Sequence, residues 1–425
     1  MDKSARKKLL KLSAELREEL VSGILPYWIN NAVDDGKGGF YGRITFNNQV
    51  IPDADKSSLL TARVLWTFSA CYREFGDPEY KRIAKHAYDF LTGACWDQEF
   101  GGIYWMTDAE GKVTDSRKYV YAQAFAIYAL SEYYGATENS EALGLAKELY
   151  SLLETKCVDP VNSGYFEAFS NNWKILDDVR LSEKDKNEPK SMNTHLHMLE
   201  AYTNLYRYWR SVDLKNSLRL LVDIFADHII DEKNMAATTF FAEDWTPKSG
   251  EFSYGHDIET SWLLLEAAEV LGDYPRKEKL RNISLGFAKH VKKEGIDKDG
   301  GVFNEGSPEG LTDENKDWWP QAEGVVGFLN AYQLLGEEDY LKAAYNIWEF
   351  IKTKVIDSQH GEWHEKVNRK GAPYELDKVR SWKCPYHNGR AALEVMHRVE
   401  LLTGDNYNSK HSVLKRSVFQ NSHQK

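Results

Sequence analysis

Apolar residues recur along this chain with the spacing of α-helices. In "LTARVLWTFSACYREF" the positions Leu60, Val64, Leu65 and Phe68 follow that spacing. The segments "YVYAQAFAIYALSEYYG", "TSWLLLEAAEVLG" and "EGVVGFLNAYQLLG" repeat the pattern, and each ends near a glycine that can cap a helix. Second helices are predicted by "PEYKRIAKHAYDFL", "EALGLAKELYSLLET" and "EDYLKAAYNIWEFIKTKV". The chain is therefore predicted to be built from pairs of helices.

Short stretches of glycine and aromatic residues separate these helix pairs. The glycine before the hydrophobic or aromatic pair recurs at gaps of 63, 62, 137 and 60 residues, at Gly39, Gly102, Gly164, Gly301 and Gly361. The long gap is about two periods, so we expect another unit near residues 230–245, in "NMAATTFFAEDW". Six units predict an all-α fold, a single closed (α/α)6 barrel of about twelve helices, with short β-hairpin loops at one rim.

The ends of the chain set the predicted domain limits. We expect one barrel domain over residues 1–407 and a polar, weakly ordered tail over residues 408–425. The first residues, "MDKSARKKLLKLSAELREEL", have no apolar core or small-residue cleavage site, so they predict an amphipathic helix and not a signal peptide.

Composition narrows the class of partner. A net charge of -11 argues against nucleic acid, since phosphate binding needs a concentrated basic face. No stretch approaches 18 apolar residues, so a membrane partner is not expected. The four cysteines are scattered without a CxxC pair, which favours the reducing cytoplasm. The 13 Trp, 24 Tyr and 18 Phe fit a large core or a carbohydrate site. We expect a monomer or weak homodimer.

Polar residues that are unusual for helix interiors precede four of the predicted inner helices. They occur in "SMNTHLHMLEAY", "SYGHDIETSW", "DWWPQAEGVVGF" and "RSWKCPYHNGRAALE", and Arg63 and Tyr121 add one residue each from the first two units. In a closed barrel such residues meet across a central cavity. Simpler explanations exist for single residues: a core position for His197, a helix cap for His256 with Glu259, a turn for His387 and a surface ion pair for Arg63.

Metal and nucleotide sites have weaker support. His195 and His197 with His256 and Glu259 could supply ligands, but a pair two residues apart splays on a helix and no HExxH pair exists. Cys384 near His387 lacks an evident third group for a nucleophilic site. GxxxxGK[ST] and GxGxxG after a strand are both missing. We therefore expect neither a metal nor a cofactor.

Six segments together resemble a known family. They are "GGFYGRI", "LLTARVLWTFSACYR", "KSMNTHLHMLEAYTNLYR", "YGHDIETSWLLLEA", "WWPQAEG" and "WKCPYHNGRAALE", and they resemble the N-acylglucosamine 2-epimerase superfamily from about residue 10 to 405. Within it the chain is most similar to the branch that acts on disaccharides. The resemblance implies an (α/α)6 barrel and a cofactor-free isomerase that converts the reducing-end glucose of a β-1,4-linked disaccharide, such as cellobiose or lactose, to mannose.

The resemblance also implies roles for individual residues. The motif positions map to His197, His256, His387, Arg63 and Glu259 for catalysis, and Trp319, Trp382, Tyr121, Asn193 and Glu323 are expected to bind the sugar. Removal of the C2 proton to give a cis-enediolate suits neutral imidazoles. Our hypothesis is that His256 and His387 serve opposite faces of C2, that Glu259 orients His256, and that Arg63 with His197 stabilises the oxyanion.

Three other functions stay open at this point. The first is a monosaccharide epimerase or aldose–ketose isomerase of the N-acylglucosamine or mannose type. The second is a glycoside hydrolase on the same barrel, with Glu259 and Glu323 as its two carboxylates. The third is a sugar-binding module without turnover.

Overall fold

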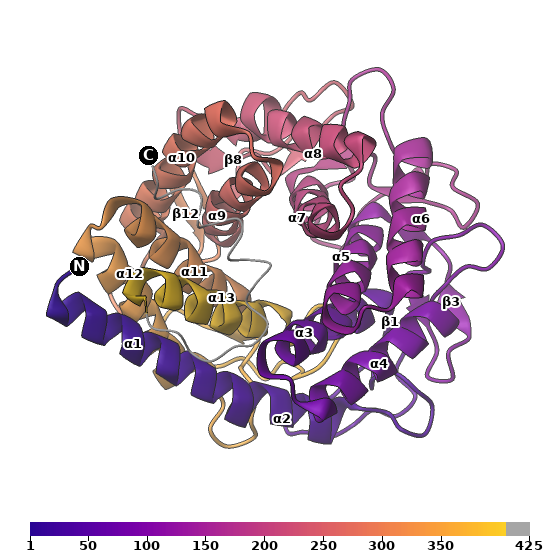
Figure 1. Cartoon of the computed structure of the whole chain (residues 1–425), viewed down its shortest axis with the longest axis horizontal. Helices are drawn as coiled ribbons and strands as arrows, with labels where there is room; N and C mark the ends of the chain where they lie inside the picture. Colours follow the sequence, from indigo (N-terminus) through magenta and orange to yellow (C-terminus); the bar gives the residue numbers. More distant parts are fainter. Residues whose placement is uncertain (405–425) are drawn as a thin grey trace.

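The computed structural model describes residues 1–404, which form two concentric rings of helices (Figure 1). The inner ring contains α3 (Ser58–Phe75), α5 (Val120–Thr137), α7 (Met192–Tyr208), α9 (Tyr254–Leu271), α11 (Trp318–Leu335) and α13 (Tyr386–Thr403). The outer ring contains α1 (Lys3–Glu18), α4 (Pro78–Gly93), α6 (Ser140–Lys156), α8 (Val212–Ile224), α10 (Tyr274–His290) and α12 (Glu338–Phe350). The predicted (α/α)6 barrel is confirmed, and the predicted tail at 408–425 lies outside the described residues.

Shorter helical segments follow several outer helices. They are η1 (Glu19–Ile24), α2 (Leu25–Tyr27), η2 (Trp28–Ala32), η3 (Phe225–Ile229), η4 (Val291–Gly295) and η5 (Ile351–Val355), and the five η segments have π-helical hydrogen bonding. Each leads the chain from the outer ring toward a hairpin.

Hydrophobic patterning separates the two rings. Every residue of α5 from Val120 to Tyr133 is buried, whereas α4 alternates buried residues with exposed charges. A helix that is apolar all round packs on every side, and an amphipathic helix covers the outside of a core. Within residues 1–404, no helix combines the length and the apolar character needed to span a membrane.

Two inner helices end as predicted, at Gly272 and Gly336 in the left-handed conformation, and α3 and α13 end in the same way at Gly76 and Gly404. The expectation that α5 ends near Gly135 is wrong. This helix continues to Thr137 and ends at Glu138, which takes the left-handed φ of 60°. Gly135 instead allows Tyr208 to pack closely against α5, because a Cβ at this position would lie 2.0 Å from the Tyr208 hydroxyl.

Very short antiparallel strand pairs tie consecutive units together at one rim. The strand before an inner helix pairs with the hairpin of the next unit in β1–β2, β4–β5, β6–β9, β10–β11 and β13–β14, while β2–β3, β11–β12 and β7–β8 are hairpin pairs. A bridge between Ile44 and Val379 joins the last unit to the first, so the ladder closes with the barrel. The strands are β1 (Lys56–Ser57), β2 (Met106–Thr107), β3 (Val113–Asp115), β4 (Lys118–Tyr119), β5 (Ala168–Phe169), β6 (Lys190–Ser191), β7 (Ile230–Asp231), β8 (Ala236–Ala237), β9 (Phe240–Phe241), β10 (Phe252–Ser253), β11 (Glu305–Ser307), β12 (Gly310–Asp313), β13 (Lys316–Asp317) and β14 (Lys366–Val367).

A buried lysine–aspartate pair locks five of the six hairpins, and we call these pairs the latches. A lysine just before an inner helix reaches the aspartate that begins the turn of its own unit's hairpin. The pairs are Lys56–Asp34 (2.8 Å), Lys118–Asp97 (2.7 Å), Lys190–Asp159 (2.7 Å), Lys316–Asp297 (2.9 Å) and Lys378–Asp357 (2.7 Å). The latches tie each of these five hairpins to the segment that leads into the inner helix of the same unit.

The fourth unit departs from this pattern. The hairpin expected near residues 230–245 is present as β7 and β8, so the sixth unit is confirmed. Phe252 stands where the other units have the lysine, and Met235 takes a left-handed φ of 51° in the turn. An apolar side chain thus replaces the lysine of the latch in this unit, while Asp231 remains at the start of the turn and accepts from Asn234 Nδ2 at 2.7 Å.

Candidate active site

The inner helices present side chains toward the barrel axis at two levels. The second residue of the helix is Tyr121 in α5, Asn193 in α7, Trp319 in α11 and His387 in α13. The sixth residue is Arg63 in α3, Phe125 in α5, His197 in α7, Glu259 in α9 and Glu323 in α11. Residues four apart share one face of a helix. The repeat therefore brings residues from distant parts of the sequence into one cluster.

Two histidines of this cluster are held by carboxylates. His197 Nδ1 lies 3.0 Å from Glu200 Oε2, and His387 Nδ1 lies 2.8 Å from Glu323 Oε1. An ionised carboxylate only accepts hydrogen bonds, so Nδ1 carries the hydrogen and Nε2 keeps its lone pair. Burial and the nearby Arg390 charge lower the pKa of both imidazoles. Both rings are therefore neutral at pH 7.

The third histidine has a different environment. The backbone N–H of His256 donates to Ser253 Oγ at 3.3 Å, so the predicted place at the start of a helix is correct. Its ring lies 4.6 Å from the Trp319 ring, and Nδ1 has no hydrogen-bond partner in the described part of the chain. The expected role of Glu259 in orienting His256 is therefore wrong. Burial lowers the pKa of His256 as well.

Arg390 forms hydrogen bonds with three buried carboxylates next to the histidines. Nη1 donates to Glu200 Oε1, and Nη2 donates to Glu259 Oε1 at 2.5 Å and to Glu323 Oε1 at 2.7 Å. Glu323 was expected to contact the sugar, but it is fully buried behind His387, and its Oε2 accepts from Trp262 Nε1 at 3.2 Å. We call Arg390 with these three glutamates the carboxylate cage.

The three carboxyl groups of the cage differ in charge. Burial alone would raise the pKa of Glu200, but the Arg390 charge and His197 hold it at about 2. Burial and the charge of Glu323 raise the pKa of Glu259 well above its ordinary value. Oε2 of Glu259 is buried and has no hydrogen-bond partner among the described residues. Glu200 is therefore ionised, and of the three carboxyl groups Glu259 is the one that most favours the protonated form.

Potential metal ligands are already engaged by protein groups. One ligand-type atom from each of Glu259, Glu323 and His387 lies within 4.8 Å of the others. The guanidinium of Arg390 binds both carboxylates at that point, and its charge opposes a cation. The other candidate, His195, donates from Nδ1 to Ser191 O at 2.7 Å, and its Nε2 accepts from the backbone N–H of Tyr165 at 3.0 Å. It holds the third hairpin instead.

Arg63 supplies a positive charge at the other side of the cluster. Its Nη2 donates to Tyr121 Oη at 2.6 Å, and its guanidinium lies 4.2 Å from the centre of the Phe125 ring. Arg63 is buried, and no carboxylate of residues 1–404 forms a salt bridge with it, so the expected alternative of a surface ion pair is wrong. A buried charge that is free of a counter-ion suits a developing oxyanion.

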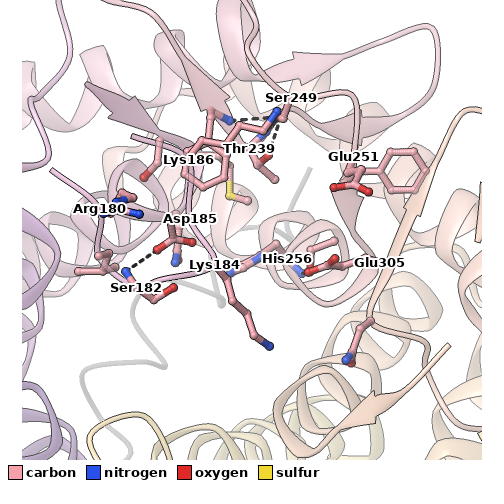
Figure 2. A pocket seen from close by; sticks show the side chains of 18 of the residues that line it. Arg180, Ser182, Lys184, Asp185, Lys186, Thr239, Ser249, Glu251, His256 and Glu305 are labelled. Atoms are coloured by element: carbon pink, nitrogen blue, oxygen red, sulfur yellow. Dashed lines mark hydrogen bonds between the residues drawn. The ribbon is translucent and has the colours of Figure 1, made fainter. Parts of the chain in front are cut away.

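A cavity of about 380 Å³ leads from the rim to this cluster (Figure 2). From the cluster, His256, Trp319 and Asn193 line it, whereas Arg63, His197 and His387 do not, and residues of the segment 179–188 and Glu305 line it as well. Trp382 does not line this cavity, and its ring packs 5.8 Å from Tyr121 and 6.1 Å from Trp105. Trp319 therefore faces the cavity directly, and Trp382 borders the cluster on the Tyr121 side.

Sequence reasoning missed three members of the cluster: Glu200, Tyr386 and Arg390. Tyr386 Oη donates to Glu200 Oε1 at 2.5 Å and thereby completes the cage. Glu200 and Arg390 are charged residues within inner helices that are otherwise largely apolar. That contrast was the available signal, because a charge on an all-buried helix needs a partner.

Comparison with known proteins supports the geometry. A family model described as N-acylglucosamine 2-epimerase (GlcNAc 2-epimerase) matches residues 39–391. The chain belongs to the N-acylglucosamine 2-epimerase family. Within that family, the cellobiose 2-epimerase of Bacteroides fragilis is 44% identical over 91% of this chain and 98% of that protein. The cellobiose 2-epimerase of Ruminococcus albus is 40% identical over the same shares of the two chains.

The fold of the family agrees with the barrel described above. The structure of cellobiose 2-epimerase from Bacillus thermoamylovorans B4167 matches with a TM-score of 0.88 at 42% identity, over 91% of this chain and 99% of that chain. As a member of the N-acylglucosamine 2-epimerase family, this protein is an enzyme of the carbohydrate epimerase and isomerase class.

Proposed function

We propose that this enzyme epimerises C2 of the reducing-end glucose in a β-1,4-linked disaccharide such as cellobiose or lactose, giving mannose at that position and running in both directions. The observation that carries the proposal is the meeting of three neutral histidines and the unpaired Arg63 at one end of a closed barrel. The similarity to cellobiose 2-epimerases supports the disaccharide as substrate.

The first step opens the sugar ring. A base takes the proton of the anomeric hydroxyl and an acid protonates the ring oxygen, which exposes the C1 aldehyde. We assign this step to His387, whose Nδ1–H is fixed on Glu323 so that Nε2 can accept and return a proton. Trp319 supports the ring by stacking beside both His256 and His387.

The second step removes the proton from C2. The aldehyde makes this proton acidic, and a neutral imidazole is a suitable base at physiological pH. Negative charge then moves to O1, where Arg63 and His197 stabilise the cis-enediolate. Tyr121 holds the guanidinium of Arg63 in place.

The third step returns a proton to the opposite face of C2. We assign one face to His256, which lines the cavity, and the other to His387, which is connected to the carboxylate cage. Because the resting imidazoles are neutral, the donating histidine must receive a proton first. The donating histidine takes this proton at Nε2 from solvent, and the histidine that removed the C2 proton returns one to solvent, so both rings are neutral again after turnover.

The hydrolase alternative has less support. A glycoside hydrolase needs two carboxylates that flank the scissile bond, about 5–9.5 Å apart. Here Glu259 and Glu323 share one guanidinium nitrogen and are both fully buried. A monosaccharide substrate is less favoured because the cavity extends from His256 to the segment 179–188. We also place the enzyme in the cytoplasm, in keeping with four buried free cysteines.

Chromatography of the products distinguishes these functions. Purified protein is incubated separately with cellobiose, lactose, mannose and N-acetylglucosamine. We expect glucosyl-mannose from cellobiose and no free monosaccharide. Free glucose would favour the hydrolase, and turnover of monosaccharides alone would replace the substrate while keeping the chemistry. A disaccharide that ends in fructose would show reprotonation at C1 in place of C2.

A further inference from the structure

Two histidine–glutamate pairs of the site are joined through a single guanidinium. Arg390 Nη1 donates to Glu200, the partner of His197, and Nη2 donates to Glu323, the partner of His387. The glutamates come from α7 and α11, and Arg390 comes from α13. Arg390 is 1% exposed, so a substrate cannot touch it. Any effect on the reaction must therefore pass through the two histidines.

We propose that Arg390 is a positioning residue that couples the His197–Glu200 and His387–Glu323 pairs into one unit, and holds both imidazoles neutral with Nε2 toward the substrate. The proposal deepens the proposed function and rests on it for the catalytic roles of the two histidines. The coupling itself is a property of the resting protein.

Geometry explains why an arginine is needed here. The planar guanidinium donates from two nitrogens in fixed directions, whereas an ammonium is a point charge. Nη1 and Nη2 therefore bind carboxylates on two different helices at the same time. Tyr386, one turn earlier on α13, donates to Glu200 as well and contacts Nη1. The two glutamates are consequently fixed relative to each other.

Arg390 also balances the negative charges of Glu200 and Glu323. Glu200 and Glu323 can accept the Nδ1–H of a histidine only while they are ionised. Without the guanidinium, two carboxylates would be buried without a counter-ion, and the site would take up protons. The charged or titratable groups around Arg390 come from six inner helices: Arg63, Tyr128, His197, Glu200, Glu259, Glu323, Tyr386 and His387. Arg63 forms no bond to the cage and cannot replace the lost charge.

The same helix offers a matched control. Arg398 lies two turns further on α13 and is also buried, at 9% exposure. Its Nη1 donates to Asn330 Oδ1 at 2.9 Å and Gln333 Oε1 at 3.0 Å, its Nε lies 3.5 Å from Glu394 Oε2, and its guanidinium lies 5.8 Å from the centre of the Trp262 ring. Loss of Arg398 therefore removes a buried guanidinium from the same helix and leaves the bonds between Arg390 and the three glutamates in place.

The experiment compares Arg390→Met, Arg390→Lys and Arg398→Met. Thermal unfolding first establishes that each variant is folded. The pH profiles of kcat and kcat/KM are then measured on cellobiose, and the imidazole 15N signals of the resting proteins are titrated by NMR. The NMR titration needs no turnover, so it tests the coupling even if cellobiose proves not to be a substrate.

We expect Arg390→Met to lower kcat by about 100-fold or more with KM changed less than about threefold. The acidic limb of its profile should rise by about one pH unit or more, since loss of a positive charge at this distance favours the imidazolium. The 15N signals of both His197 and His387 should shift to higher pKa. Arg398→Met should lose stability and keep the wild-type profile.

Arg390→Lys decides the case if Arg390→Met does not fold. A lysine keeps the charge but can fix only one of the two carboxylates, so one histidine should titrate as in the wild type and the other should change. A folded Arg390 variant with the acidic limb and both histidine titrations of the wild type would overturn the proposal. Inactivity of the wild-type protein together with coupled histidine titrations would instead reject the proposed function alone.

Discussion

Two buried polar regions of this barrel, the latches and the carboxylate cage, differ in how their charges are balanced. In four latches one lysine meets one aspartate, as in Lys118–Asp97 at 2.7 Å, with side-chain exposures of 0% and 1%, and in the fifth Lys316 meets Asp297 and Asp299. In the carboxylate cage three glutamates share one arginine, and Glu259 Oε2 has no partner among the described residues. The latches hold hairpins in place, and the cage holds the carboxylates that contact His197 and His387.

The fourth unit shows that the latches are replaceable. Phe252 occupies the place of the lysine there, and the hairpin and the inner helix α9 still form. Asp231 keeps the place of the aspartate in this unit, where it is only half-buried and accepts from Asn234 Nδ2 at 2.7 Å. A fully buried aspartate such as Asp97 would be left with an uncompensated charge without its lysine, whereas replacement of both members of such a pair by apolar groups often leaves stability unchanged. The cage has no such apolar substitute, because its charges act on the histidines. The comparison predicts opposite outcomes for substitutions in the two regions.

The largest effect on turnover is expected for His387→Ala. Loss of an acid–base group typically lowers kcat by about 10²–10⁴-fold, and the free energy of unfolding should change little. Steady-state kinetics on cellobiose and chemical denaturation measure the two quantities. His86→Ala is the matched control, because His86 on the outer helix α4 contacts the Gly39 carbonyl at 2.6 Å and the Phe40 ring at 5.6 Å, away from the histidine cluster. Equal losses of kcat in both variants would contradict the assigned site.

A latch should show the reverse pattern. Lys118→Met leaves Asp97 buried without its partner and should lower the free energy of unfolding by about 3–5 kcal/mol. The kcat per folded molecule should remain near the wild-type value. The double variant Lys118→Met/Asp97→Leu should recover most of the stability, as urea denaturation can show. If the double variant were as unstable as the single one, the latches would do more than balance charge.

Stacking at the cavity should affect binding more than the chemical step. Trp319→Ala removes the ring beside His256, and KM should rise by about 3- to 10-fold. Trp382→Ala should have a smaller effect on KM, because Trp382 does not line the cavity. Initial rates over a range of cellobiose concentrations provide the comparison. A larger effect of Trp382 would mean that the disaccharide lies on the Tyr121 side of the cluster.

The smallest and most specific effect concerns Glu259. Its pKa is raised in the folded state, so its contribution to stability is complete below pH of about 4.5 and is lost as pH rises toward the folded pKa. Glu259→Gln cannot ionise and should lose less stability than the wild type between pH 5 and pH 8. Urea denaturation at several pH values measures this difference. Parallel pH curves for the two proteins would show that Glu259 is ionised in the fold.

The helical repeat was predictable because each unit repeats the same spacing of apolar residues and glycines. The sequence therefore predicted the barrel, the sixth hairpin and the cluster of His197, His256, His387 and Arg63. The end of α5 was not predictable, because contact with Tyr208 from the next inner helix decides the role of Gly135.

The partners of the site residues were harder to predict than the residues themselves. Glu259 follows His256 by three residues, and sequence proximity suggested a pair. In the structure Glu259 faces Arg390, which is 131 residues away. His387 and Glu323 are 64 residues apart. Such pairs depend on how the helices turn about their axes, and the one-dimensional pattern does not contain that information.

The central claim is that two different histidines remove and return the C2 proton. The most direct test is NMR of the first few per cent of reaction with cellobiose in D2O. Two bases on opposite faces predict a glucosyl-mannose product that is fully deuterated at C2, while the remaining cellobiose keeps its proton. A product that retains the original C2 proton would show that a single residue carries it across, and would contradict the account.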